Sequence, residues 1–316
     1  MSIDSPNSYA RRLAARLGGS ASAFFAVAML TFALTLTGCG EEPTAEETAT
    51  EGAAGEGTAA AEEPESAATP EQAFAVAVEE AQGKGAWRSQ PAFAADFELK
   101  FGAAPPLLAD LLMTTNADAV RMDLEGGGVV IYDGTDVWTS PAGLEMPPGP
   151  RFHALTWPYF LAAPMKLRDP GSHLELTGER QLDGKTYDTA RLTFDAGVGD
   201  TPDDWYVLYR DPETGRLAAM AYIVTYGTSV EQAGQEPHII VYEDFEEVDA
   251  GLEGETVTLP TRWTFWNWSE EAGLEGEQLG EATLGNPRFV QPDLGAFDRM
   301  EGAEKATLPG TGAGTG

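Results

Sequence analysis

Apolar residues recur at every second position from Phe93 to Phe101, and this pattern constrains the chain more than any other. An aspartate, a glutamate and a lysine stand among the residues between them. Residues 119–125 alternate in the same way. Successive side chains of a β-strand point to opposite faces, so such a segment buries one face and exposes the other. The sequence therefore predicts β-strands that each cover one side of a core.

Turn sequences containing glycine separate further strand-like segments. Asp133-Gly134 and Asp183-Gly184 each lie between two of them, and residues 211–215 separate a third pair. Glycine adopts the positive φ of tight hairpin turns at little cost. About ten strands, mostly antiparallel, are expected in one domain over residues 71–295. The further expected strands are 129–132, 136–139, 174–182, 187–194, 205–210, 217–226, 238–248, 256–268 and 277–290.

Several of the expected strands are apolar on both faces. Residues 220–224 and 263–268 carry apolar side chains at odd and even positions alike. In a sheet with one face exposed to solvent, apolar and polar residues alternate along each strand. The absence of this alternation means that either the outer face is covered too or the inner face lines a cavity. Residues 151–166 are rich in aromatic side chains and are expected to cover the sheet. Pro158 and Pro164 are expected to break this segment into short helical pieces.

A helix is expected to open the domain. Thr69 suits its N-cap, Pro70 suits its first turn, and the acidic residue that follows suits its positive end. Gly83 and Gly85 are expected to end it. On these grounds the predicted fold class is mainly β with some helix (α+β).

A basic leader, an uncharged apolar run and a single cysteine stand in that order near the N-terminus. Residues 21–36 carry no charge, and Leu36-Thr37-Gly38-Cys39 ends the run. The run is shorter than the roughly 20 apolar residues that span a bilayer as a stable helix. The alternative is an uncleaved membrane helix, which the small residues Thr37 and Gly38 disfavour. The arrangement resembles a bacterial lipoprotein signal peptide with its lipobox, which would occupy residues 1–38.

This resemblance implies that Cys39 is acylated and that the chain is cut before it. Bacterial lipoproteins carry two or three acyl chains at this cysteine, and two or more chains hold a protein firmly to a membrane. Gly40 stands where an aspartate would signal inner-membrane retention. The expected location is therefore the outer membrane, facing the periplasm. A single cysteine excludes an intramolecular disulfide and a four-thiolate metal site.

Two segments are expected to be disordered. Residues 39–70 are acidic and rich in alanine and contain no aromatic residue, so burial cannot offset the entropy lost on ordering. As a flexible tether they would span roughly 30 Å on average. Residues 296–316 are expected to form a second disordered segment at the C-terminus.

The charge of the chain excludes one class of partner. It has 51 acidic and 19 basic residues and a net charge of −32. Binding of nucleic acid requires a basic surface, so no nucleic-acid partner is expected. The sequence contains no Walker loop, no G-x-S-x-G elbow and no GxGxxG turn after a strand. Neither an enzyme nor a cofactor is therefore expected.

One loop offers weak candidates for a metal site. Asp200, Asp203 and Asp204 lie close together in sequence and supply the hard oxygen ligands that Ca²⁺ prefers. The alternative is a turn in which aspartate side chains cap the backbone before the next strand. The three histidines of the chain show no paired spacing typical of metal ligands, so they are expected to be structural.

Three motifs carry a second resemblance. They are Trp157-Pro158-Tyr159-Phe160, residues 166–171 (KLRDPG) and residues 197–206 (GVGDTPDDWY). They are similar to motifs of an uncharacterised family of bacterial lipoproteins related to LolA, over most of residues 90–290. The resemblance implies the fold of the LolA/LolB superfamily. That fold is a curved antiparallel sheet, or half-open β-barrel, with short helices packed on its concave face.

The anchor and this resemblance together predict a lipoprotein whose half-barrel holds a lipid, the acyl chains of another lipoprotein or another hydrophobic ligand. The alternative is a structural or interaction lipoprotein whose barrel is filled by its own side chains. Large aromatic and apolar side chains line ligand pockets and also fill cores. The residues expected to line a ligand cavity are Phe97, Phe101, Met122, Trp138, Trp157, Phe160, Tyr222, Trp263 and Phe265.

Overall fold

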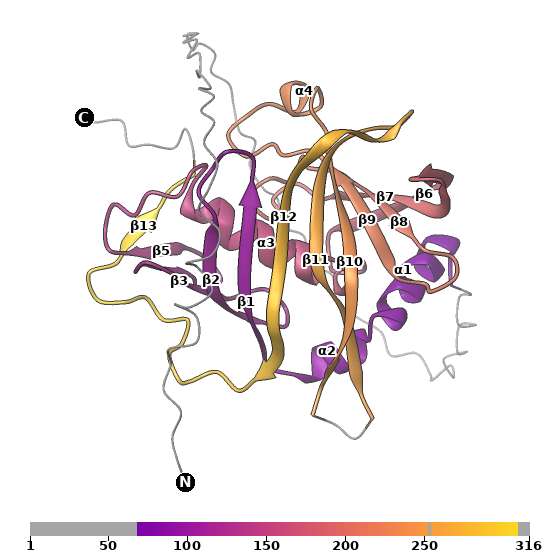
Figure 1. Cartoon of the computed structure of the whole chain (residues 1–316). Helices are drawn as coiled ribbons and strands as arrows, with labels where there is room; N and C mark the ends of the chain where they lie inside the picture. The colour runs from indigo at the N-terminus through magenta and orange to yellow at the C-terminus, as the bar shows by residue number, and fades with distance from the viewer. Residues whose placement is uncertain (1–67, 252–253, 309–316) are drawn as a thin grey trace, which may run out of the picture. The chain divides into compact units, whose positions relative to one another are not determined.

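The alternating segments form one antiparallel sheet of 13 strands, which curves without closing into a barrel (Figure 1). The computed structural model describes residues 68–251 and 254–308. The predicted signal peptide, Cys39, residues 40–67 of the tether and residues 309–316 lie outside the described residues. The strands are β1 (Ala92–Phe101), β2 (Leu107–Thr114), β3 (Val120–Leu124), β4 (Val129–Tyr132), β5 (Val137–Ser140), β6 (Ser172–Leu182), β7 (Lys185–Phe194), β8 (Tyr206–Arg210), β9 (Leu217–Tyr222), β10 (His238–Asp249), β11 (Thr256–Ser269), β12 (Gly273–Val290) and β13 (Glu304–Ala306).

Two meanders lie side by side in the sheet. Strands β1 to β5 pair with their neighbours in chain order, and so do β6 to β12. The meanders join where β1 pairs with β12, which sets Phe97 opposite Leu284. All of these pairings are antiparallel, as short turns between consecutive strands require. The predicted fold class, a mainly β domain with a curved antiparallel sheet and few short helices, is confirmed.

The helices of the described part of the chain are short. They are α1 (Pro70–Ala81), α2 (Lys84–Ser89), α3 (Pro150–Ala162), the 3₁₀ helix η2 (Ala163–Met165) and α4 (Val230–Ala233). None of these helices has the length and apolar character needed to cross a membrane.

The start of α1 agrees with its sequence signals. The Thr69 side chain accepts a hydrogen bond from the Gln72 N–H, and the Gln72 side chain accepts one from the Thr69 N–H. This reciprocal pair is a capping box. Gly83, with φ of +80°, separates α1 from α2, as predicted for a helix end. Gly85 lies inside α2, so its predicted role in ending a helix is wrong.

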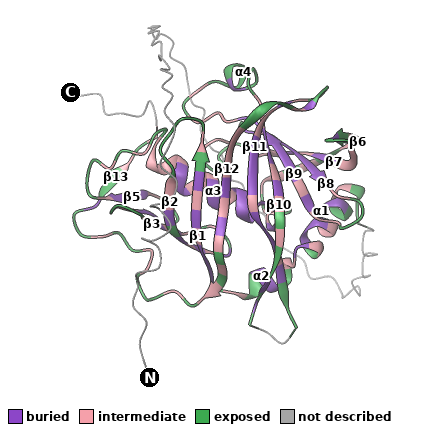
Figure 2. Ribbon diagram, viewed as in Figure 1, coloured by how far each residue is buried: buried purple, intermediate pink, exposed green. Residues whose placement is uncertain are grey.

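Helix α3 lies on the concave face of the sheet, and Figure 2 shows it largely buried there. The Trp157 ring lies 6.3 Å from Phe97 of β1 and 5.9 Å from Phe265 of β11. The Tyr242 hydroxyl of β10 donates to the Phe160 carbonyl at 2.8 Å. Residues 151–166 therefore cover the sheet. The expected break at Pro158 is wrong, because α3 continues through it: burial of this helix outweighs the one hydrogen bond that proline removes.

The outer face of β7 to β11 explains the strands that are apolar on both sides. Tyr206 and Leu208 belong to the main core, whereas Val207 and Tyr209 belong to a second buried cluster on the opposite face. Trp268, near the end of β11, belongs to that second cluster, and its indole donates to the Tyr209 hydroxyl at 2.9 Å. The end of the long β11–β12 hairpin thus covers the outer face.

Two strands were not predicted. Strand β2 pairs with both β1 and β3. Its sequence LLADLLMT has apolar residues at odd and even positions alike, so it lacks the alternation that indicates a strand. Strand β13 pairs with β5, with Lys305 opposite Trp138. The predicted disorder from residue 296 is therefore wrong for the part that forms β13. The Arg299 guanidinium also packs over the Trp138 ring, 4.2 Å from its centroid.

Candidate functional site

Two adjoining cavities lie beside α3. We call the first the tyrosine cavity, because Tyr159, Tyr206, Tyr222 and Tyr226 line it; its volume is about 290 Å³. We call the second the proline cavity, because Pro105, Pro106, Pro147 and Pro148 line it; its volume is about 520 Å³. The residues that line both cavities, and so form the wall between them, are Phe152, Thr156, Phe160, Tyr222 and Val224.

The sequence of α3 accounts for this placement. Phe152, Thr156 and Phe160 follow one another at intervals of four residues, which places them along one face of a helix. That face lines both cavities. Ala154 and Leu161 are fully buried in the main core instead. Helix α3 therefore packs on the sheet and also supplies one wall of the cavities.

His153 lies at the proline cavity with both ring nitrogens engaged. The Trp157 indole donates to Nδ1 at 2.9 Å, so Nε2 carries the proton and donates to the Pro147 carbonyl, also at 2.9 Å. Burial lowers the pKa of His153, against the smaller opposing effect of the Pro147 carbonyl. These contacts favour the neutral imidazole and tie it to Pro147 and Trp157, as a structural histidine would be.

We expect the free energy of unfolding to fall as the pH drops below about 6.5, the pKa of an unperturbed histidine. Because the pKa of His153 is lower in the folded protein, the unfolded chain binds a proton at this residue more readily than the folded protein does. The contribution of His153 is therefore full above the unfolded pKa and is lost as the pH falls toward the lower folded pKa. His153→Gln keeps an acceptor and a donor but does not titrate. Urea titrations at several pH values should show a smaller loss for this variant.

His238 provides a second test of the same effect. Burial lowers its pKa too, with Glu236 acting in the opposite direction. The double variant His153→Gln/His238→Gln should lose more of the pH dependence than either single variant. An undiminished loss of stability below pH 6.5 in the double variant would contradict this account.

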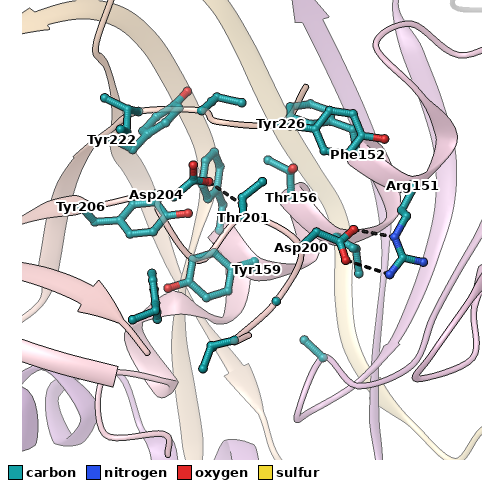
Figure 3. A pocket seen from close by; sticks show the side chains of 18 of the residues that line it. Arg151, Phe152, Thr156, Tyr159, Asp200, Thr201, Asp204, Tyr206, Tyr222 and Tyr226 are labelled. Atoms are coloured by element: carbon teal, nitrogen blue, oxygen red, sulfur yellow. Dashed lines mark hydrogen bonds and ion pairs between the residues drawn. The ribbon is translucent and has the colours of Figure 1, made fainter. Parts of the chain in front are cut away.

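The tyrosine cavity has a charged pair at one side, shown in Figure 3. Arg151 Nε donates to Asp200 Oδ2 at 2.5 Å, and Arg151 Nη2 donates to Asp200 Oδ1 at 2.8 Å. The side chains are only 13% and 16% exposed. The hydrogen bond that Arg151 donates to Asp200 raises the pKa of Arg151 despite its burial. This bidentate pair joins the start of α3 to the loop between β7 and β8.

Asp204 is a buried carboxylate in the wall of the tyrosine cavity. Its Oδ1 accepts from the Thr225 N–H and hydroxyl, each at 2.7 Å. Its Oδ2 accepts from the Thr201 hydroxyl at 2.7 Å (Figure 3). Burial raises the pKa of Asp204, and these hydrogen bonds oppose that rise. The carboxylate therefore fixes two loops, at Thr201 and at Thr225.

The three aspartates do not form a metal site. Asp200 is paired with Arg151, Asp204 is bonded to threonines, and Asp203 is exposed. Within residues 68–251 and 254–308, no group of three histidine, cysteine, aspartate or glutamate side chains converges as metal ligands would. The geometry of this loop therefore gives no support to the Ca²⁺ alternative. Asp204 does accept from a backbone N–H, but this N–H belongs to Thr225 and not to the turn before the next strand, where the alternative placed it.

The predicted cavity residues fall into two groups. Those that line the cavities are Phe101, Trp157, Phe160 and Tyr222. Those that line neither cavity are Phe97, Met122, Trp263 and Phe265, which fill the main core, and Trp138. Trp138 faces the C-terminal segment and donates to Asp133 Oδ2 at 2.7 Å. Aromatic type alone does not separate a core position from a cavity position.

Several lining residues were not predicted. Phe152 and Thr156 could have been found from their spacing of four with Phe160, once residues 151–162 were treated as one helix. Tyr226 lies beyond the end of β9, in a stretch that was expected to be strand. Its place beside Gly149 depends on the tertiary fold. The sequence carries no local signal for that contact.

Comparison with known proteins gives matches to this fold. Residues 153–242 match a family of unknown function (DUF6503). A LolA superfamily protein from Nitrosomonas europaea has 13% sequence identity over 70% of this chain and 97% of its own, with a TM-score of 0.45. A DUF1329 family protein from Desulfovibrio piger has 11% identity over 73% of this chain and 98% of its own, with a TM-score of 0.45. No curated protein matches this sequence.

Proposed function

We propose that this chain is a membrane-anchored lipoprotein whose half-barrel binds a lipid or another hydrophobic ligand. The observation that carries the proposal is the pair of adjoining cavities, of about 290 and 520 Å³, beside α3. Ligand cavities measure about 300–1,000 Å³ and have mainly apolar linings with a few placed polar groups. The common wall formed by Phe160 and its neighbours allows one elongated ligand to extend from one cavity into the other.

The lining of the proline cavity supports an apolar ligand. Leu99, Phe101, Leu107 and Met146 contribute apolar side chains to it, and the polar atoms of His153 are already bonded within the protein. Burial of an acyl chain is favourable by about 0.8 kcal/mol for each methylene removed from water. An acyl chain placed there leaves no polar group of His153 without a partner.

The proposed anchor is supported by the sequence alone. Acylation of Cys39 at the lipobox would hold the protein to the outer membrane, facing the periplasm, and the acidic tether would keep the domain off the lipid surface. A ligand site held near a membrane suits a role in the movement of lipids or lipoproteins within the cell envelope.

Filling the common wall is expected to abolish ligand binding. Val224 lines both cavities, and a tryptophan at this position would occupy space in each of them. The full chain, held in lipid nanodiscs, is exposed to a fatty acid that carries a photoreactive diazirine, and labelled peptides are identified by mass spectrometry. We expect light-dependent labelling of peptides from α3 and β9, and a fall of roughly tenfold or more in Val224→Trp.

Val230→Trp is the matched control. Val230 starts α4, is 39% exposed and lines neither cavity, so this variant should label like the unchanged protein. Cavity labelling that is equal in both variants, or that is absent with this probe and also with probes that carry other heads, would rule out the binding proposal.

One observation favours the second candidate, a lipoprotein that acts through its surface. Trp263 and Phe265 fill the concave face between β10 and β12 and are almost completely buried, so that part of the half-barrel is packed by the protein itself. The same labelling experiment separates the two functions, because a protein without a ligand would give only scattered surface labelling.

A further inference from the structure

Polar groups are distributed unequally between the two cavities. In the proline cavity, His153 is already hydrogen-bonded, Glu145 is exposed, and His238 lies against Tyr222 of the common wall, with 6.0 Å between the two ring centroids. The tyrosine cavity instead gathers five tyrosines, from β4, α3, β8, β9 and the segment after β9, and Figure 3 labels all of these except the one from β4. Any amphiphile that occupies both cavities therefore meets an apolar end and a hydroxyl-rich end.

The tyrosine hydroxyls are available to a ligand. Among residues 68–251 and 254–308, none accepts a hydrogen bond from the hydroxyls of Tyr159, Tyr206 or Tyr222. The Tyr226 hydroxyl is buried and also finds no acceptor for its proton there. The Phe152 N–H favours the ionised form of Tyr226 but is itself a donor, so it leaves the hydroxyl proton without an acceptor. Buried donors without acceptors are uncommon in proteins, because each costs desolvation energy.

These hydroxyls act as donors and not as phenolates. Burial raises the pKa of Tyr159, Tyr206 and Tyr222 above the ordinary value for tyrosine, and nearby carboxylates raise the pKa of Tyr159 and Tyr206 further. Burial also raises the pKa of Tyr226. All four therefore present neutral O–H groups, which suit oxygen acceptors such as ester carbonyls and alcohols.

The cations of the tyrosine cavity are already neutralised. Arg151 is held in the bidentate pair with Asp200. The Lys166 ammonium lies 2.5 Å from an oxygen of Asp169 and donates to the Asn116 carbonyl at 3.0 Å. Asp204, bonded only to threonines among the described residues, adds a carboxylate to the wall. A phosphate or carboxylate head would therefore be buried here without a free cation, which is strongly unfavourable.

We infer that the tyrosine cavity binds the uncharged, oxygen-rich head of an amphiphile, such as an acylglycerol, while the apolar chain lies in the proline cavity. This inference rests on the proposed binding function and names the class of ligand. Thr156, in the wall between the cavities, adds a hydroxyl where the head would meet the chain.

The test compares three probes that share one diazirine-bearing chain and differ only in the head: a monoacylglycerol, a fatty acid and an alkylamine. The full chain in lipid nanodiscs is labelled with each probe at equal concentration, and the yield on cavity peptides is measured by mass spectrometry. We expect the yield of labelled cavity peptides to be at least about tenfold higher with the monoacylglycerol than with either charged probe. The reason is that burial of an unpaired charge lowers the affinity more than tenfold.

Tyr226→Phe tests the head site directly. The loss of one hydrogen bond should lower labelling by the monoacylglycerol about three- to tenfold and leave labelling by the fatty acid unchanged. Tyr132→Phe is the matched control, because Tyr132 also lines the tyrosine cavity but its hydroxyl already donates to the Gly134 carbonyl at 3.0 Å. The ratio between probes is the readout, and a partial loss of folding would lower both yields together.

Each outcome decides between the claims. If a fatty acid or an alkylamine labelled the cavity peptides as well as the monoacylglycerol does, the inference of an uncharged ligand head group would be wrong. The proposed binding function would not be affected. A ratio that Tyr226→Phe does not change would also overturn it. Absence of labelling by every probe would overturn the binding function itself, and this inference with it.

Discussion

Trp87→Ala is expected to lower the free energy of unfolding by about 3–5 kcal/mol, the usual range when a buried tryptophan becomes alanine. Trp87 of α2 is fully buried, and its ring lies 5.4 Å from Phe93 and 5.5 Å from Phe289. Its indole donates to the Thr115 carbonyl at 2.5 Å. The substitution would leave a large void and also an unpaired carbonyl. Urea denaturation followed by circular dichroism measures the loss.

The position of Trp87 explains why the loss should spread through the domain. Phe93 belongs to β1 and Phe289 to β12, and these strands join the two meanders. Thr115 follows β2. One indole therefore links α2 to the β1–β12 pairing that joins the two meanders. Its removal should weaken contacts between parts of the chain that are distant in sequence.

Two further variants separate the causes. Trp87→Phe keeps most of the ring but removes the hydrogen bond, so it should lose less stability than the alanine variant. Trp138→Ala is the control for loss of a tryptophan as such, because Trp138 is only half-buried and lies outside the main core. If Trp87→Ala lowered the free energy of unfolding no more than Trp138→Ala, the contacts of Trp87 at the β1–β12 pairing would not contribute especially to stability.

The strands that the sequence predicted best are those with their own local signals. Asp183 and Gly184 have φ of +48° and +75°, as a tight hairpin turn between β6 and β7 requires, and both strands occur where they were predicted. In β1, Phe93 and Phe97 are almost completely buried, whereas Lys100 is exposed. In both cases the signal, a turn residue or a period of two, lies within a few consecutive residues of the sequence.

The elements that the sequence did not predict depend on distant partners. Strand β13 has three residues and exists by pairing with β5. Helix α3 continues through Pro158 because its neighbours Trp157 and Leu161 are buried against the rest of the domain. Local propensity is a weak guide where tertiary contacts decide.

The candidate site was predicted in part for the same reason. The segment that covers the sheet was identified from its aromatic residues, and Trp157 and Phe160 do line cavities. Phe97 and Trp263 have the same chemical character but pack into the core. A cavity forms where neighbouring side chains fail to fill space, which is a property of the assembled fold and not of residue type.

Cys39→Ser is expected to abolish acylation and to leave an uncleaved precursor. The thiol of Cys39 is the only one in the chain, and serine supplies no sulfur to accept the diacylglyceryl group that the lipobox resemblance implies. Cells that express the full chain are grown with radiolabelled palmitate. The unchanged protein should incorporate the label and run as the shorter, mature form. The variant should show no label and should run as the longer form.

Fractionation of cells alone would not test this prediction. The uncleaved precursor keeps the apolar run 21–36, which can itself hold the chain at a membrane, so the variant need not become soluble. Labelling and size are therefore the decisive measurements. Gly40→Ser, one residue beyond the acylated position, is the matched control and should still be labelled and cleaved. If Cys39→Ser matched this control in both label and size, acylation and cleavage would not depend on Cys39, and the lipobox interpretation would be wrong.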